Sequence, residues 1–142
     1  MFRRLWLLIE EPRVRRVLWS TIYGAVMIAG ISVLVQPPSS IRSLIGPQLA
    51  LAWSLLLAVG GALGAWSTLT RWWVIERIAI IFAGTGATIY GATVLANHFL
   101  EQGNRLPQLM FICAFIMALS IRHWDIRRFN QAPKPATTPI AL

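Results

Sequence analysis

Four long apolar stretches, separated by short polar segments, organise this chain. They cover residues 17–35, 48–69, 74–99 and 108–122, and their centres contain no Asp, Glu, Lys, Arg or His. Uncharged runs of about twenty residues are typical of helices that cross the hydrocarbon of a bilayer. The pattern therefore predicts an all-α, polytopic membrane protein, a four-helix transmembrane bundle with its membrane domain in residues 1–129.

The two ends of the chain have different patterns. Residues 2–11 carry apolar side chains at helical spacing, namely Phe2, Leu5, Trp6 and Ile9. This spacing predicts a short amphipathic helix that lies in the membrane interface, and the alternative is a frayed segment that only carries topogenic charge. Residues 130–142 contain three prolines among alanine and threonine, so we expect a flexible cytoplasmic tail there.

Prolines mark the connections between the spans. Pro37 and Pro38 end the first span, because proline has no amide donor and restricts the residue before it. We expect the connection that follows to lie along the interface, because it contains Ile41, Leu44 and Ile45. The fourth span is the shortest, so a re-entrant half-span is the alternative to a full crossing.

Composition supports a lipid environment. The chain of 142 residues is 56% hydrophobic and 13% charged, which is too few charges to cover a water-soluble domain of this size. The net charge of +8 comes from bases that flank the apolar runs. We therefore predict anionic lipid headgroups as the partner of the basic segments, and no specific nucleic acid.

The distribution of the bases predicts the orientation. Eleven of them fall on one side of a four-span topology: Arg3, Arg4, Arg13, Arg15, Arg16, Arg71, Arg77, Arg122, Arg127, Arg128 and Lys134. The other side has two, Arg42 and Arg105. Cytoplasmic loops are enriched in Lys and Arg, so both termini are predicted to face the cytoplasm, with the protein in the cytoplasmic membrane. A three-span topology would place the C-terminal bases outside, against this rule.

Small residues recur every four positions in two of the spans. The second span has the pair Gly60 and Gly64, and the third span has two ladders: Ala83, Ala87 and Gly91, and Gly84, Thr88, Ala92 and Ala96. Small residues let membrane helices approach closely. The ladders either pack the helices of one monomer or mate with a second copy. Because one helix carries two ladders, we predict a homo-oligomer, and we expect Gly64→Leu or Gly91→Leu to disrupt association.

Aromatic and basic residues close to the span ends are predicted interfacial anchors. They are Trp19, Trp72, Trp73, Trp124, Arg71, Arg77 and Arg122. We interpret Glu76 and Arg77 as a structural interfacial pair or a topology signal at the start of the third span. We expect Thr85, Thr88 and Thr93 to act as donors between helices.

Signatures of enzymes, metal sites and cofactors are missing from the sequence. His98 and Glu101 are too few for a metal site, and Ser32, Ser54 and Ser120 are expected to bond back to helical carbonyls. No catalytic residue, metal or cofactor is predicted, and enzyme function is not expected. Small multidrug transporters also have four spans, but that family needs a glutamate in its first span, which residues 17–35 lack.

The overall plan resembles small polytopic membrane proteins of actinobacterial phages, including holin-like proteins. The resemblance lies in the basic start, the Gly/Ala-rich second span, the turn over residues 70–77, and the C-terminal bases around Trp124. It implies lateral assembly in the inner membrane and permeabilisation during phage lysis. The alternatives are a non-enzymatic accessory or scaffold subunit that binds another membrane protein, and a small channel or transporter.

Overall fold

The computed structural model describes residues 13–37, 39–70, 72–100 and 104–131. Within these ranges the chain forms helices α2 (Arg13–Val35), α3 (Ser39–Thr70), α4 (Trp73–Leu100) and α5 (Leu106–Gln131). The predicted interfacial helix at 2–11 and residues 132–142 of the predicted tail lie outside the described residues. The first two residues of that predicted tail, Asn130 and Gln131, belong to α5.

The predicted all-α class is confirmed for the part of the chain that the structure describes. Each of its four helices contains a stretch long and apolar enough to cross a membrane, at Val14–Val35, Gly46–Thr70, Trp73–Leu100 and Leu106–Arg127. These stretches contain the four predicted spans. The chain therefore has the properties of a membrane protein.

A kink at Gly46 divides α3. Gly46 has φ 75° and ψ 164°, a conformation that L side chains rarely adopt, and Pro47 follows it. The backbone before the kink is helical from Ser39, in the connection that was predicted to lie along the interface and for which no helix was predicted. Proline terminates helices but also begins them readily, and Pro37 and Pro47 lie on either side of this short helical segment.

The fourth helix is longer than its predicted span. The side-chain oxygen of Asn104 accepts a hydrogen bond from the Leu106 amide at 3.1 Å and helps to start α5, and the helix continues to Gln131. Its apolar stretch of 22 residues extends about 33 Å at 1.5 Å per residue, which matches a hydrocarbon core of about 30 Å. The helix thus has the length for a full crossing, which the half-span alternative does not require.

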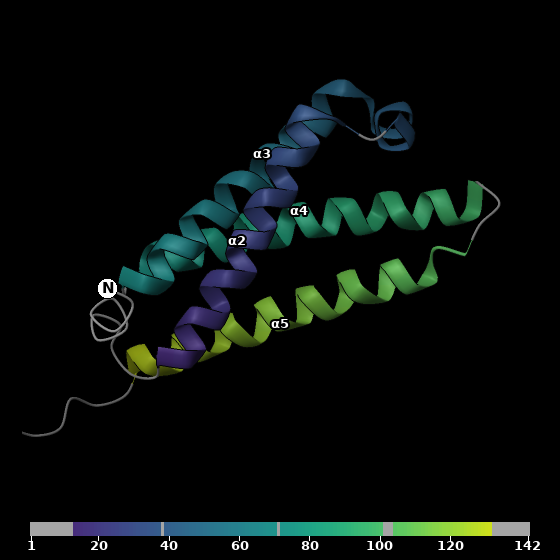
Figure 1. Ribbon diagram of the computed structural model, residues 1–142. Helices are drawn as coiled ribbons and strands as arrows, with labels where there is room; N and C mark the ends of the chain where they lie inside the picture. The colour runs from purple at the N-terminus through teal and green to yellow at the C-terminus, as the bar shows by residue number, and fades with distance from the viewer. Residues whose placement is uncertain (1–12, 38, 71, 101–103, 132–142) are drawn as a thin grey trace, which may run out of the picture.

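The helices form two antiparallel hairpins, α2–α3 and α4–α5, which pack together through α3 and α4 (Figure 1). The hairpins converge where α2 begins and α5 ends, and we call this the terminal end of the bundle. They diverge toward the distal end, where α4 ends and α5 begins (Figure 1). The first and last described residues therefore lie at the same end.

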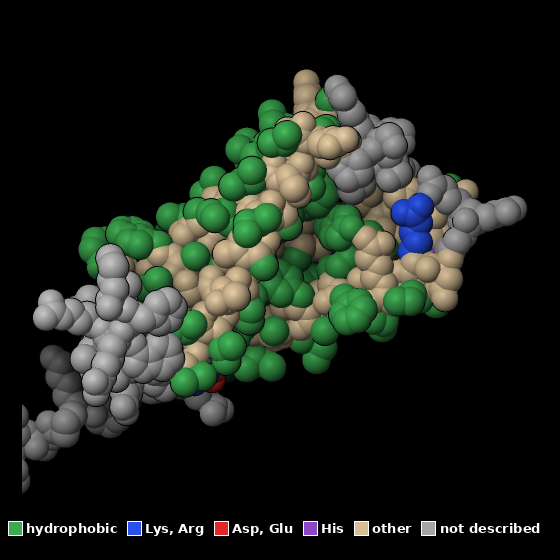
Figure 2. Space-filling view, in the orientation of Figure 1, with side chains coloured by type: hydrophobic (Ala, Val, Ile, Leu, Met, Phe, Trp, Pro, Cys, Tyr) green, Lys and Arg blue, Asp and Glu red, His purple; other side chains and the backbone are tan. Residues whose placement is uncertain are grey.

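Apolar side chains are spread over the face of the bundle that Figure 2 shows. The exposed fraction is 65% for Ile28, 58% for Ile81 and 79% for Phe111, on three different helices. Water-soluble monomers rarely expose large contiguous apolar surfaces. The interior is small and includes a cluster around Tyr23, Ala83 and Leu119 that joins α2, α4 and α5.

Candidate functional site: the terminal end and the outer face of α4

Two ion pairs tie α5 to the other helices at the terminal end. The Glu76 carboxylate on α4 accepts a hydrogen bond of 2.6 Å from Arg122 Nε, and these side chains are only 6% and 13% exposed. The Arg15 guanidinium on α2 forms an ion pair with Asp125, and both of these side chains are more exposed. The terminal end is thus held by opposite charges.

Aromatic rings of α2 complete this ion-pair cluster. The Arg122 guanidinium carbon lies 5.6 Å from the centre of the Trp19 ring, within the range of a cation–π interaction. Trp19 in turn lies 6.0 Å from Tyr23, which is fully buried. The Tyr23 hydroxyl has no hydrogen-bond partner among the described residues. Arg122 therefore bridges α4 and α2 from its position on α5.

The position of Glu76 corrects one sequence interpretation. We expected Glu76 and Arg77 to pair, but the carboxylate points to Arg122 on another helix. Consecutive helical residues do not face each other, so a buried Glu76 takes its partner from a packed neighbour. Arg122, predicted as an interfacial anchor, belongs to this mostly buried ion pair.

The other predicted anchors divide by exposure. Trp72 and Trp124 are 58% and 63% exposed, whereas Trp73 and Trp19 are half-buried and pack against the cluster around Tyr23. Arg71 lies outside the described residues. The level of these side chains in a bilayer stays a prediction.

The Gly60 and Gly64 pair packs α3 against both of its neighbours. A Cβ at Gly60 would lie 2.8 Å from the backbone nitrogen of Ala83 on α4, and a Cβ at Gly64 would overlap the Tyr23 ring on α2. Both glycines are therefore occupied by contacts within one chain.

The first ladder of α4 is also buried within the chain. Ala83 and Ala87 are 0% and 6% exposed, and a Cβ at Gly91 would lie 3.3 Å from the Ile112 side chain on α5. Leucine at Gly64 or Gly91 would therefore disturb the fold of the monomer itself. These two substitutions would therefore not separate loss of association from loss of the monomer fold, and the homo-oligomer stays a prediction.

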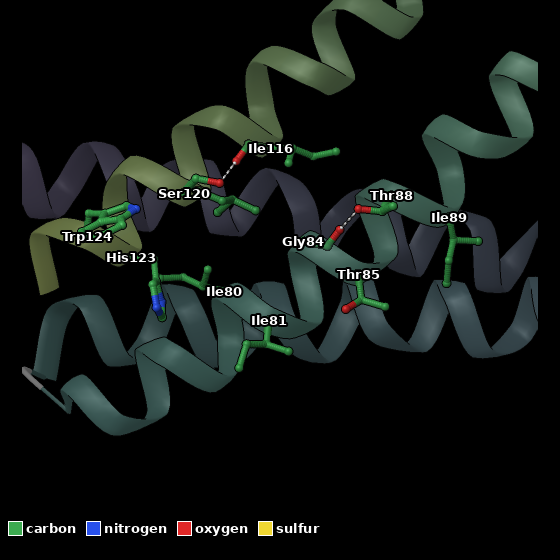
Figure 3. Close-up of a pocket in the computed structure, with 11 residues that line it drawn as sticks. Ile80, Ile81, Gly84, Thr85, Thr88, Ile89, Ile116, Ser120, His123 and Trp124 are labelled. Atoms are coloured by element: carbon green, nitrogen blue, oxygen red, sulfur yellow. Dashed lines mark hydrogen bonds between the residues drawn. The ribbon is translucent and has the colours of Figure 1, made fainter. Parts of the chain in front are cut away.

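The second ladder of α4 faces outward. Gly84 and Thr88 line a groove of about 540 Å³ between α4 and α5, with Ser120 and Trp124 on its far side (Figure 3). A Cβ at Gly84 would have its nearest neighbour, Leu119, at 4.0 Å. Ala92 is exposed further along the same face. No helix of the described chain covers this ladder.

Several serine and threonine hydroxyls on the spans bond to carbonyls of their own helices. Ser32, Ser54 and Ser120 bond back to carbonyls three or four residues earlier, which confirms the prediction. Thr88 and Thr93 do the same, bonding the carbonyls of Gly84 and Ile89, so the expectation that these two bond between helices is wrong. A hydroxyl that does bond between helices is that of Ser20 on α2, which donates to the Ala65 carbonyl on α3 at 3.1 Å.

Some close contacts were not predicted from the sequence. A Cβ at Gly30 would collide with the backbone of Ala58, and one at Gly61 would collide with the backbone of Met27, so α2 and α3 touch along their backbones. The signal was a glycine within an apolar span, which marks close helix approach but does not name the partner.

Among the described residues, no three His, Cys, Asp or Glu side chains lie close enough together to hold a metal ion. Comparison with protein-family models, characterised proteins and solved structures yields no match for the chain.

Proposed function

We propose that the protein is a non-enzymatic, integral protein of the cytoplasmic membrane that associates with further copies of itself and permeabilises that membrane in the manner of a holin. Four helices cross the bilayer, both termini face the cytoplasm, and the basic segments contact anionic headgroups. This proposal follows from the charge distribution of the sequence and from the apolar surface of the bundle.

The outward ladder of α4 is the observation that carries the proposal. Lipid tails are as apolar as leucine, so membrane helices associate through close packing of small residues and through polar contacts. Gly84, Thr88 and Ala92 leave such a face open after the chain has packed its own helices. A second copy that packs there would bring two backbones into close approach.

An accessory subunit would use the same face of α4 to bind a different membrane protein. The induction experiment below distinguishes this function from permeabilisation. A channel within one monomer has less support, because the hydroxyls of Ser54, Thr88 and Ser120 are bound to carbonyls of their own helices.

Induction of the gene alone tests permeabilisation. We expect the membrane potential, measured with a voltage-sensitive dye, to collapse after a delay, and cells that also hold a muralytic enzyme in the cytoplasm to lyse. Normal potential and growth together with stoichiometric co-purification of another membrane protein would establish the accessory function instead. A normal membrane potential, with the protein inserted in the membrane and no other protein co-purifying with it, would refute the proposal.

A matched pair of substitutions tests the role of the ladder. Gly84→Leu fills the outward groove and is expected to reduce crosslinked oligomers and permeabilisation together, while the monomer stays folded. Gly24→Leu is the control, because a Cβ at Gly24 on α2 also has open space around it. Equal oligomer yields from the two variants would contradict association through the α4 face.

A further inference from the structure

A second cleft opens between α2 and α5 toward the distal end of the bundle. It has a volume of about 540 Å³. Ala29 and Phe111 belong to its two walls, on α2 and α5, and Leu57 and Ala87 form its floor on α3 and α4. Hydrophobic side chains surround the hollow between α2 and α5 (Figure 2). All four described helices contribute to this cleft.

The cleft exists because α2 and α5, the outer helices of the two hairpins, approach each other at one end only, whereas the hairpins also contact each other through α3 and α4. The Arg15–Asp125 ion pair joins α2 to α5 at the terminal end, and from there the helices separate (Figure 1). The cleft is therefore open sideways, toward the surroundings of the bundle.

The side chains that line the cleft distinguish a helix from a thinner occupant. Large side chains, among them Val26, Phe111 and Phe115, line it, whereas the outward face of α4 presents small residues. Membrane helices pack closely where small residues let their backbones approach, so these large side chains disfavour a further helix. A single hydrocarbon chain is much narrower than a helix and can lie between them.

One end of the cleft is polar. The Gln108 side-chain amide donates a hydrogen bond to the Tyr90 hydroxyl, and both residues line the cleft. A hydroxyl that accepts one hydrogen bond keeps its own proton to donate. Gln108 is in the first turn of α5, so this donor lies where a spanning helix leaves the hydrocarbon.

A buried indole stands behind this polar end. Trp53 is 2% exposed and stacks on Tyr90, with ring centres 5.2 Å apart and planes at 11°. Its indole nitrogen has no hydrogen-bond partner among the described residues. It packs against Val26 and Leu57, which line the cleft. Trp53 holds the Tyr90 ring in place but does not itself line the cleft, so the Tyr90 hydroxyl is the donor considered at the polar end.

We propose that the cleft between α2 and α5 binds one acyl chain of a glycerophospholipid, with the ester carbonyl of that chain accepting a hydrogen bond from Tyr90. The hydrophobic effect gives no preference for the cleft over the bilayer, since both are apolar. The preference comes from dispersion contacts with the otherwise unfilled lining and from the hydrogen bond at the polar end. The inference requires insertion of the bundle into a bilayer, and it does not require permeabilisation.

Photocrosslinking in vesicles tests the site. The full-length protein is reconstituted into vesicles of phosphatidylethanolamine and phosphatidylglycerol that contain a phospholipid with a diazirine on one acyl chain, and labelled peptides are identified by mass spectrometry. We expect label to concentrate on the cleft walls around Ala29 and Phe111. Label spread evenly over the exposed apolar residues of all four helices would overturn the proposal.

Filling the cleft provides the matched comparison. Ala29→Phe inserts a ring at an exposed position of the α2 wall and is expected to reduce cleft labelling several-fold. Ala52→Phe makes the same change at an exposed position of α3 away from the cleft and is expected to leave labelling unchanged. Equal labelling in the two variants would contradict a specific site.

The polar end is tested separately. Tyr90→Phe removes one hydrogen bond and is expected to lower labelling by the ester lipid about fivefold. An ether-linked analogue, which lacks the carbonyl, is expected to label wild-type protein and Tyr90→Phe alike. Equal labelling of wild-type protein and Tyr90→Phe by the ester lipid would refute the carbonyl contact. Resistance of the protein to alkaline extraction from the vesicles separates failure of this site from failure of insertion.

Discussion

At the scale of single residues, glycines determine where the helices cross, because they have no side chain to keep a neighbouring helix away. Gly64 has a hydrogen atom where any other residue would place a carbon inside the Tyr23 ring. The sequence indicated that glycine would pack, because the spacing to Gly60 is typical of helix contacts. It did not indicate Tyr23 as the partner, since spacing defines a face of one helix and not what lies opposite.

Alanine at Gly64 is expected to destabilise the monomer by about 1–3 kcal/mol, because the Tyr23 ring must move out of a packed cluster. Gly24→Ala is the control and is expected to be neutral or stabilising by up to about 1 kcal/mol, since its Cβ meets nothing and alanine favours the helix. Unfolding in mixed micelles with increasing sodium dodecyl sulfate measures both variants. Equal stability of the two would argue against the α2–α3 contact.

The Glu76–Arg122 ion pair makes a second prediction at this scale. Glu76→Gln leaves the largely buried Arg122 guanidinium without its counter-charge and is expected to cost about 3–5 kcal/mol in the same unfolding assay. Replacing both residues, by Glu76→Leu with Arg122→Met, removes both charges and is expected to recover most of this loss. A double variant as unstable as Glu76→Gln would show that the unpaired Arg122 charge does not cause the loss of stability.

At the scale of helices, hydropathy predicted the spans well and their ends less well. Four long uncharged stretches are hard to place anywhere but in membrane-spanning helices, and each predicted span lies within an observed apolar helix. The helical backbone before the Gly46 kink was missed, because Ile41, Leu44 and Ile45 are equally compatible with an irregular interfacial segment. The end of α5 could not be placed from hydropathy, because charged residues from Arg122 onward interrupt the apolar run, whereas in the structure Glu76 pairs with Arg122 and the helix continues to Gln131.

The Arg15–Asp125 ion pair makes a prediction about the α2–α5 contact. Arg15→Asp places two acids together and is expected to separate the start of α2 from α5, whereas Arg15→Asp with Asp125→Arg restores the attraction. Spin labels on cysteines at the exposed positions 18 and 121, in a Cys113→Ala background, report the separation by pulsed electron resonance. The single reversal should broaden and lengthen the distance distribution. A distribution unchanged by either variant would mean that this pair does not hold the helices together.

At the scale of the whole molecule, two features indicate a membrane protein: an apolar outer surface and the positions of the charged residues. The described helices expose large apolar side chains outward, and their small interior keeps one buried ion pair. The sequence already contained both features, because hydropathy and the positions of the thirteen bases are read directly from it. The outward face of α4 and the cleft between α2 and α5 were not predictable, since they depend on which faces the monomer leaves unfilled.

The central claim is that these helices cross a bilayer with both ends of the chain on its cytoplasmic side. Single cysteines at positions 104 and 127, which are exposed at opposite ends of α5, test it in a Cys113→Ala background with a membrane-impermeant maleimide. The account predicts that position 104 is labelled in intact spheroplasts and that position 127 is labelled only after the membrane is permeabilised. Labelling of both positions from the same side, or of position 127 alone in intact spheroplasts, would contradict it.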